Sequence, residues 1–158
     1  MKKMILLISI CCLLLITGCV NNSNNDKVDN STDANDTKKN DKKISDIKVI
    51  INDKTYTLKL ENNKTVDEFL ELLPQEFTMN ELNGNEKYVY MDKSLTTNSY
   101  NPRHIEKGDV MLYGDSCLVI FYKSFDTSYS YTKIGHIDNL PNLGSGSISL
   151  KIKQSHRK

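Results

Sequence analysis

The sequence predicts an all-β domain that closes into a barrel and carries one short helix. From Ile47 onward, apolar residues recur with a period of two, which is typical of strands. Segment 108–125 holds two apolar runs, 110–113 and 117–122, separated by a Gly-Asp dipeptide that favours a hairpin turn. Both faces of this hairpin are apolar. Strands buried on both sides fit a closed barrel with an outer helix better than a two-layer sandwich.

The N-terminal segment predicts export and a lipid anchor. Two lysines precede an apolar run of about 13 residues, 4–16, well short of the roughly 20 that span a bilayer as a helix. The run ends in Leu-Ile-Thr-Gly-Cys at 15–19, which resembles the bacterial lipobox, whose cysteine receives a diacylglyceryl group. We expect residues 1–18 to be a lipoprotein signal peptide and Cys19 to be the lipid attachment site. The alternative is an ordinary signal peptide with a chance cysteine.

The lipid bilayer is therefore an expected partner, and the chain is expected at the extracytoplasmic face of the cell membrane. Residues 19–45 are dominated by Asn, Asp, Lys, Ser and Thr, which bury too little apolar surface to offset the entropy of ordering. We expect a disordered tether, whose reach as a flexible coil is on the order of 25–30 Å. The formal charge of +1 argues against a nucleic-acid partner.

Alternating apolar residues predict the other strands of the domain, which we assign to residues 46–153. A first hairpin joins Ile47, Val49 and Ile51 to a second apolar face at 56, 58 and 60, through a turn at 52–53 or 53–54. Strands are also expected at 77–82 and 88–91, around Asn-Gly-Asn, and at 129–137. A last strand points 148, 150 and 152 inward and closes the barrel, and 154–158 form a basic tail.

One short helix is expected at residues 66–73. Thr65 and Glu68 fit a capping box, in which each side chain bonds the backbone amide of the other residue. Val66, Phe69, Leu70 and Leu73 fall at helical spacing, and a proline follows them. We expect this stripe to cover an open face or end of the sheet.

The sequence predicts a two-residue turn at Gly114-Asp115 in the central hairpin. This register pairs Tyr113 with Ser116 and gives the two strands two different faces. The face predicted to fill the barrel holds Val110, Leu112, Cys117, Val119 and Phe121. The face predicted to meet a cover or a pocket holds Met111, Tyr113, Leu118, Ile120 and Tyr122.

With these elements in order, the domain resembles the bacterial cyclophilin-like domain family. The resemblance covers residues 46–153 and implies a closed barrel of about eight strands. The resemblance says much less about activity than about fold, because members of this group are largely uncharacterised. The matching residues are Phe-Leu-Glu-Leu-Leu-Pro at 69–74, Asn-Glu-Lys-Tyr at 85–88, Glu-Lys-Gly-Asp-Val-Met-Leu-Tyr-Gly-Asp at 106–115, Phe-Tyr-Lys-Ser-Phe at 121–125 and Ser-Tyr-Thr-Lys-Ile-Gly at 130–135.

No catalytic residue is carried over from that resemblance. True cyclophilins isomerise prolyl bonds with an arginine beside a hydrophobic pocket, usually with tryptophan and histidine at its rim. This chain has no tryptophan and no Phe-His-Arg segment, and its domain arginines are Arg103 and Arg157. The sequence does not decide whether the protein is an enzyme, and it favours a protein without catalytic activity. Prolyl isomerisation is the specific enzymatic candidate, with Arg103-His104 as a convergent equivalent.

Other reactive side chains predict no further chemistry. The histidines at 104, 136 and 156 lack metal-ligand spacing, so we expect no metal site and no cofactor. The four cysteines form no disulfide framework, and Cys117 reads as an inert core thiol. Glu86, Asp109 and Asp115 flank turns and read as solvated caps, with a general-acid pair as the alternative.

Three functions remain, and the first is preferred. It is a membrane-anchored surface lipoprotein whose domain binds a peptide or small molecule. The others are a divergent peptidyl-prolyl isomerase and a structural or assembly lipoprotein. Residues 92–107 lack a sustained period, so they form either a functional loop or a plain surface loop. The candidate ligand-binding residues are Met79, Tyr88, Arg103, Tyr113, Tyr122 and Tyr131.

Overall fold

A computed structural model describes residues 45–153 of the chain. The predictions for the signal peptide, Cys19, most of the tether and the basic tail lie outside these residues. Among residues 45–153, no helix is both long enough and apolar enough to cross a bilayer.

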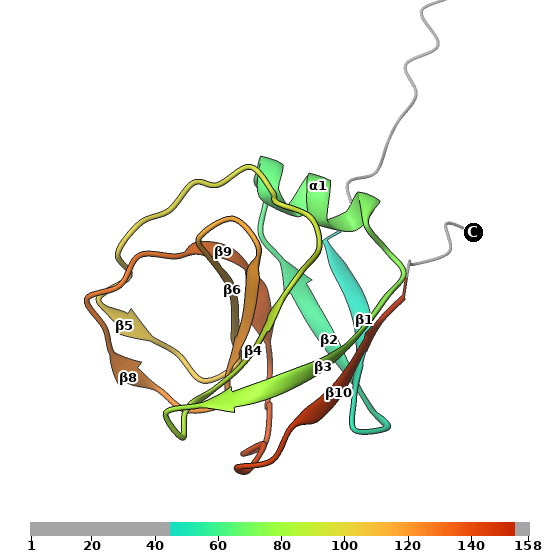
Figure 1. The fold of residues 1–158 in the computed structure, drawn as a ribbon, viewed down its shortest axis with the longest axis vertical. Helices are drawn as coiled ribbons and strands as arrows, with labels where there is room; N and C mark the ends of the chain where they lie inside the picture. The colour runs from blue at the N-terminus through green and yellow to red at the C-terminus, as the bar shows by residue number, and fades with distance from the viewer. Residues whose placement is uncertain (1–44, 154–158) are drawn as a thin grey trace, which may run out of the picture. The chain divides into compact units, whose positions relative to one another are not determined.

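Eight antiparallel strands form a closed barrel in the order β1-β10-β3-β4-β7-β6-β9-β2 (Figure 1). Strands β5 and β8 form a separate two-stranded ribbon. The predicted all-β barrel with one short helix is confirmed. In chain order the elements are β1 (Asp46–Ile51), β2 (Lys54–Leu60), α1 (Lys64–Glu71), β3 (Gln75–Leu82), β4 (Glu86–Tyr90), β5 (His104–Ile105), β6 (Asp109–Tyr113), β7 (Cys117–Phe121), β8 (Phe125–Asp126), β9 (Thr132–Ile137) and β10 (Ile148–Ile152).

The first hairpin and the last strand close the barrel as predicted. Ile51 pairs with Lys54, so the turn is Asn52-Asp53, and both residues take the positive φ of a tight hairpin turn, 45° and 67°. Strand β10 pairs with β1 on one side and β3 on the other. Its alternate residues Ile148, Leu150 and Ile152 are buried in the barrel.

Helix α1 lies at one end of the barrel (Figure 1) and starts differently from the prediction. Its N-cap is Asn63, whose Oδ1 accepts from the Val66 amide at 2.9 Å, so the expected capping box is wrong. The Thr65 hydroxyl instead donates to the Thr96 carbonyl at 2.6 Å. Glu68 accepts from the Thr96 amide and hydroxyl at 2.6 and 2.7 Å, so both side chains fasten the loop after β4.

The apolar stripe of α1 is buried as predicted, although the helix spans 64–71 and not 66–73. Val66 and Phe69 have no exposed surface and belong to the same core cluster as the strand residues inside the barrel. Burial of such side chains stabilises the fold by about 1.5–3 kcal/mol each.

The central hairpin has a register that corrects the predicted faces. Tyr113 pairs with Cys117, so the loop has three residues and includes Ser116. The Ser116 and Asp115 carbonyls accept from the Met91 and Leu95 amides at 2.8 Å each, which holds the loop from a distant segment. One extra loop residue exchanges the two faces of the second strand.

The two faces of β6 and β7 therefore belong to two hydrophobic clusters. Inside the barrel, Val110 and Leu112 pack with Leu118 and Ile120. On the outer face Met111 packs with Cys117, Val119 and Phe121, together with Ile105, Tyr131 and Phe125. The ribbon β5-β8 and the segment before β9 cover this outer face. Helix α1 lies instead at an end of the barrel, which is one of the two placements expected for it. This outer cluster carries the candidate site.

Candidate functional site

Strand β4 presents a polar and aromatic face to the outside of the barrel. Glu86, Tyr88 and Tyr90 alternate along the strand, so they point to one side of the sheet, while Lys87 and Val89 point to the other. Across the sheet, Glu86 pairs with Phe121, Tyr88 with Val119 and Tyr90 with Cys117. The strand pairing therefore places these three β4 side chains next to the outer cluster.

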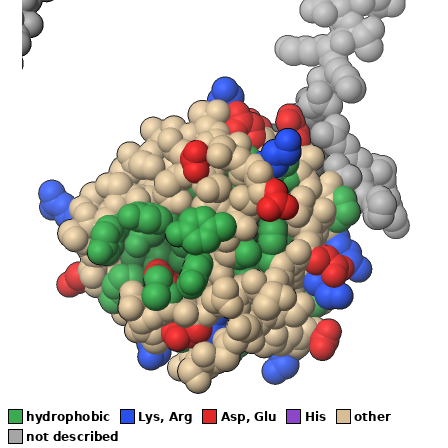
Figure 2. Space-filling model, in the orientation of Figure 1, with side chains coloured by type: hydrophobic (Ala, Val, Ile, Leu, Met, Phe, Trp, Pro, Cys, Tyr) green, Lys and Arg blue, Asp and Glu red, His purple; other side chains and the backbone are tan. Residues whose placement is uncertain are grey.

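A pocket of about 300 Å³ opens on this face, at the lower end of the roughly 300–1,000 Å³ typical of small-molecule sites. Figure 2 shows the same face as a hydrophobic patch with an acidic side chain inside it, and Glu86 is the acidic residue of the pocket wall. Five of the eight tyrosines of the chain contribute to the wall. The wall is formed by Leu82, Asn83, Glu86, Tyr88, Tyr90, Tyr113, Cys117, Val119, Tyr129 and Tyr131.

The tyrosines of the pocket form two groups of contacting rings, and their exposure ranges from a buried base to an exposed rim. The Tyr113 ring lies 6.1 Å from Tyr129 and 5.6 Å from Tyr131, between ring centroids. Tyr88 and Tyr90 meet edge to face at 6.1 Å. Tyr131 is only 5% exposed, whereas Tyr90 and Tyr129 are 67% and 61% exposed. The base of the pocket is therefore buried, and its rim is open to solvent.

Glu86 places a carboxylate in the wall of the pocket with 9% of the residue exposed. Burial is the main cause that raises its pKa, and the neighbouring charge of Glu81 adds to it. Within residues 45–153, this carboxylate accepts no hydrogen bond and pairs with no cation. Its negative charge also adds to the effect of burial in raising the pKa of Cys117 and of Tyr131. The prediction that Glu86 is a solvated cap is wrong.

The structure brings three of the six candidate ligand residues together. Tyr88, Tyr113 and Tyr131 line the pocket, whereas Arg103 is an exposed loop residue outside its wall. Met79 is fully buried inside the barrel. Tyr122 is buried there too, and its hydroxyl donates to Glu81 Oε1 at 3.2 Å. Tyr122 points inward because of the corrected register of the central hairpin.

Sequence reasoning did not include Glu86, Tyr90 or Tyr129 among the candidate ligand-binding residues. The first two had a readable signal, because they alternate with Tyr88 and must share its face of the strand. Tyr129 had no such signal. It lies in the irregular segment before β9, which is placed by the pairing of Tyr100 with Tyr131.

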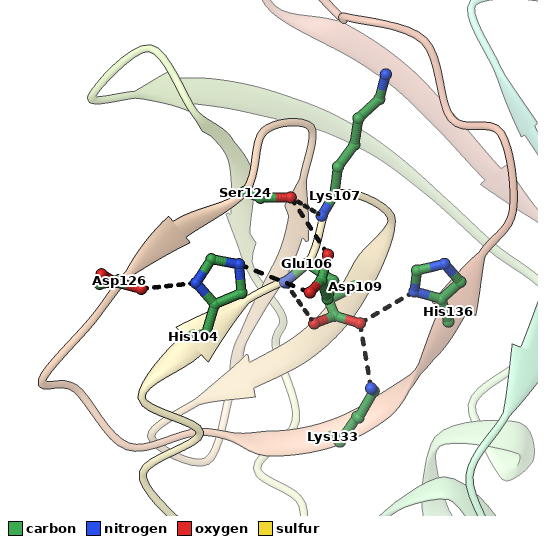
Figure 3. A network of polar contacts seen from close by, with 8 residues as sticks. All are labelled: His104, Glu106, Lys107, Asp109, Ser124, Asp126, Lys133 and His136. Carbon is green, nitrogen blue, oxygen red and sulfur yellow. Dashed lines mark hydrogen bonds and ion pairs between the residues drawn. The ribbon is translucent and has the colours of Figure 1, made fainter.

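A second polar cluster is centred on Asp109, at the start of β6 (Figure 3). Asp109 is 2% exposed, so the prediction of a solvated cap is wrong here as well. Its Oδ2 accepts from the Glu106 amide at 3.0 Å. Its Oδ1 lies 3.0 Å from His136 Nδ1 and 3.2 Å from Lys133 Nζ. These contacts join β6 to β9, and they give Asp109 a structural role.

A histidine lies on the other side of this network. The hydrogen bond between His104 Nδ1 and Asp126, 2.6 Å long, is the main cause that raises the pKa of His104. His104 Nε2 lies 3.6 Å from Glu106 (Figure 3). The contact between His104 and Asp126 joins β5 to β8 at the surface. Among residues 45–153, no group of three or more His, Cys, Asp or Glu side chains is arranged to hold a metal ion.

Replacing Asp109 by asparagine should lower the free energy of unfolding by about 2 kcal/mol, because it removes the buried negative charge that the Lys133 ammonium and the His136 ring contact. This cost is at the low end of what is usual when a buried ion pair loses one partner, because the Lys133 and His136 side chains are each about one-third exposed and can regain water. Urea denaturation followed by circular dichroism measures it. The exposed Asp115→Asn is the matched control, expected within about 0.5 kcal/mol of the unmodified chain. Equal stability of the two variants would contradict the structural role.

Comparison with known proteins agrees with this architecture. A sequence model of the cyclophilin-like family matches residues 49–153, which include the whole pocket wall. The chain belongs to the cyclophilin-like family. The predicted resemblance is confirmed. No curated protein and no solved structure matches the chain.

Family membership establishes the fold of the cyclophilin-like domain but not its function. What the pocket can bind has to be inferred from the side chains that line it. The wall of the pocket in this cyclophilin-like domain contains no lysine and no arginine among the described residues. It combines aromatic faces, a few apolar side chains and one buried carboxylate. Such a site can hold a small ligand by contact and charge.

Proposed function

We propose that this protein is a membrane-anchored surface lipoprotein whose cyclophilin-like domain binds a small ligand in the tyrosine pocket. The observation that carries the proposal is the concave wall of five tyrosines around a buried carboxylate. Ligand sites are typically concave and mostly apolar, with a few polar groups that fix orientation. The lipobox-like sequence ending at Cys19 supports the anchor.

Prolyl isomerisation has less support from the placement of the side chains. That reaction needs a cationic donor beside the pocket that receives proline. Arg103 is exposed, and it is absent from the pocket wall. No observation favours a purely structural lipoprotein either, because such a role does not require a pocket.

Tyr113→Ala should weaken ligand binding by at least about tenfold, because Tyr113 connects the aromatic wall through two ring contacts. A panel of cationic, neutral and anionic small molecules, tested by ligand-dependent shifts in melting temperature, supplies the ligand. Tyr100→Ala is the matched control, because Tyr100 is 47% exposed against 45% for Tyr113 and lies outside the pocket wall.

Binding that survives Tyr113→Ala, and also Tyr131→Ala, would remove the site from this pocket. A panel in which no compound of any charge class shifts the melting temperature would contradict the ligand-binding function itself.

A further inference from the structure

The charge of the pocket restricts what can occupy it. Glu86 is the acidic group of the wall, and the cation that follows it in sequence cannot neutralise it. Lys87 points to the other side of β4, where its Nζ donates to the Gly144 and Gly146 carbonyls at 2.6 Å each. The same ammonium lies 5.0 Å from the centre of the Tyr122 ring. Glu86 is therefore left unpaired while its neighbour is fully engaged elsewhere.

Glu86 is 9% exposed as a residue, and its carboxylate lines the pocket without a cationic partner among residues 45–153. A cation that enters the pocket can pair with this carboxylate away from bulk water, where the attraction between the two charges is stronger. The tyrosines around it favour the same charge, because the face of an aromatic ring carries negative potential and attracts cations. Anionic ligands are disfavoured, since Glu86 and Glu81 would repel them.

The remaining wall selects among cations. A primary ammonium is strongly hydrated and needs several hydrogen-bond acceptors in exchange for its water. Apart from the Glu86 carboxylate, the Asn83 side chain and the tyrosine hydroxyls, the wall offers apolar contact, from Leu82, Val119, Cys117 and the tyrosine rings. Methyl groups on the nitrogen would meet these surfaces without any loss of hydrogen bonds. Aromatic walls of this kind suit alkylated ammonium groups.

We propose that the tyrosine pocket selects a small organic cation that carries an alkylated ammonium group. This inference rests on the proposed ligand-binding function and names the ligand class of that site. Glu86 provides the charge partner. Tyr88, Tyr113 and Tyr131 provide the aromatic surfaces against which the methyl groups pack.

Three compounds with one hydroxyethyl scaffold test the charge and the alkylation separately. They are choline, ethanolamine and the neutral isostere 3,3-dimethylbutan-1-ol. Calorimetric titration of the full chain should give a choline affinity at least about tenfold above that of the other two. Equal affinity for the neutral isostere would overturn the charge argument. Stronger binding of ethanolamine would overturn the alkylation argument.

Two variants assign the effect to named side chains. Glu86→Gln keeps the shape and removes the charge, so choline affinity should fall at least about tenfold while that of the isostere stays the same. Tyr113→Leu keeps apolar contact and removes the ring, and it should also weaken choline selectively. Glu76→Gln, at an exposed position of β3, is the control expected to change neither affinity. Unchanged choline binding in both pocket variants would overturn the proposal.

The outcomes separate this inference from the function on which it rests. A neutral or anionic compound that binds and is lost on Tyr113→Ala, while choline does not bind, would leave a ligand-binding pocket but contradict the cation preference. Failure of every compound in the mixed-charge panel would contradict both.

Discussion

Gly135→Ala should lower the free energy of unfolding by about 3 kcal/mol, the upper end of the usual cost of overfilling a packed core. A Cβ at Gly135 would lie 2.2 Å from the Lys59 carbonyl oxygen and 2.9 Å from Leu58 Cδ1. Gly135 pairs with Leu60 of β2 and with Val110 of β6, so neither neighbouring strand can withdraw without loss of barrel pairing. Total stability of an ordinary domain is about 5–15 kcal/mol, so this loss is large.

Urea denaturation of the full chain measures the effect, and Gly146→Ala is its matched control. A Cβ at Gly146 has nothing within 4 Å, and the backbone carbonyl that accepts from Lys87 is retained. The control should stay within about 0.5 kcal/mol of the unmodified chain. If both alanine variants were equally stable, β2 and β9 could not approach each other as closely as described.

Cys19→Ser should move the protein from the membrane fraction to the soluble extracytoplasmic fraction. Serine has no sulfur to take the diacylglyceryl group, and a chain without acyl groups loses the anchor that they provide. Among residues 45–153, no helix is long and apolar enough to cross a bilayer. Fractionation followed by immunoblotting measures the distribution. Cys12→Ser, within the apolar run of the predicted signal, is the matched control and should leave the protein on the membrane. Retention of the Cys19→Ser chain on membranes would contradict the lipobox assignment.

The barrel could be predicted from sequence because several of its strands, β1 and β10 among them, alternate between buried and more exposed residues. Ile47, Val49 and Ile51 fix one face of β1, and either of the two expected turns, 52–53 or 53–54, brings the same apolar faces of the first hairpin together. The central hairpin lacked this constraint, because both of its faces are apolar and a slip of one residue exposes no polar side chain. Its loop length depends on amides at 91 and 95, which local sequence cannot reveal.

The candidate site was predictable only in part, because it also depends on contacts between segments that lie far apart in the sequence. Tyr88 and Tyr113 could be selected as aromatic residues on strands. Glu86 was interpreted as a turn cap, because its position beside β7 and the segment before β9 depends on the folded structure. Asp109 was misread in the same way, since its partners Lys133 and His136 lie far along the chain. Burial of a carboxylate is set by tertiary contacts and has no local sequence signal.

Choline titration monitored by two-dimensional NMR tests the central claim most directly. The mature chain is held in micelles of a detergent without a choline headgroup, and amide shifts are followed residue by residue. Saturable changes are expected to concentrate at Glu86, Tyr88, Tyr113 and Tyr131. Saturable changes confined to residues outside the pocket wall, or no changes at all, would contradict the claim that this pocket binds a small organic cation.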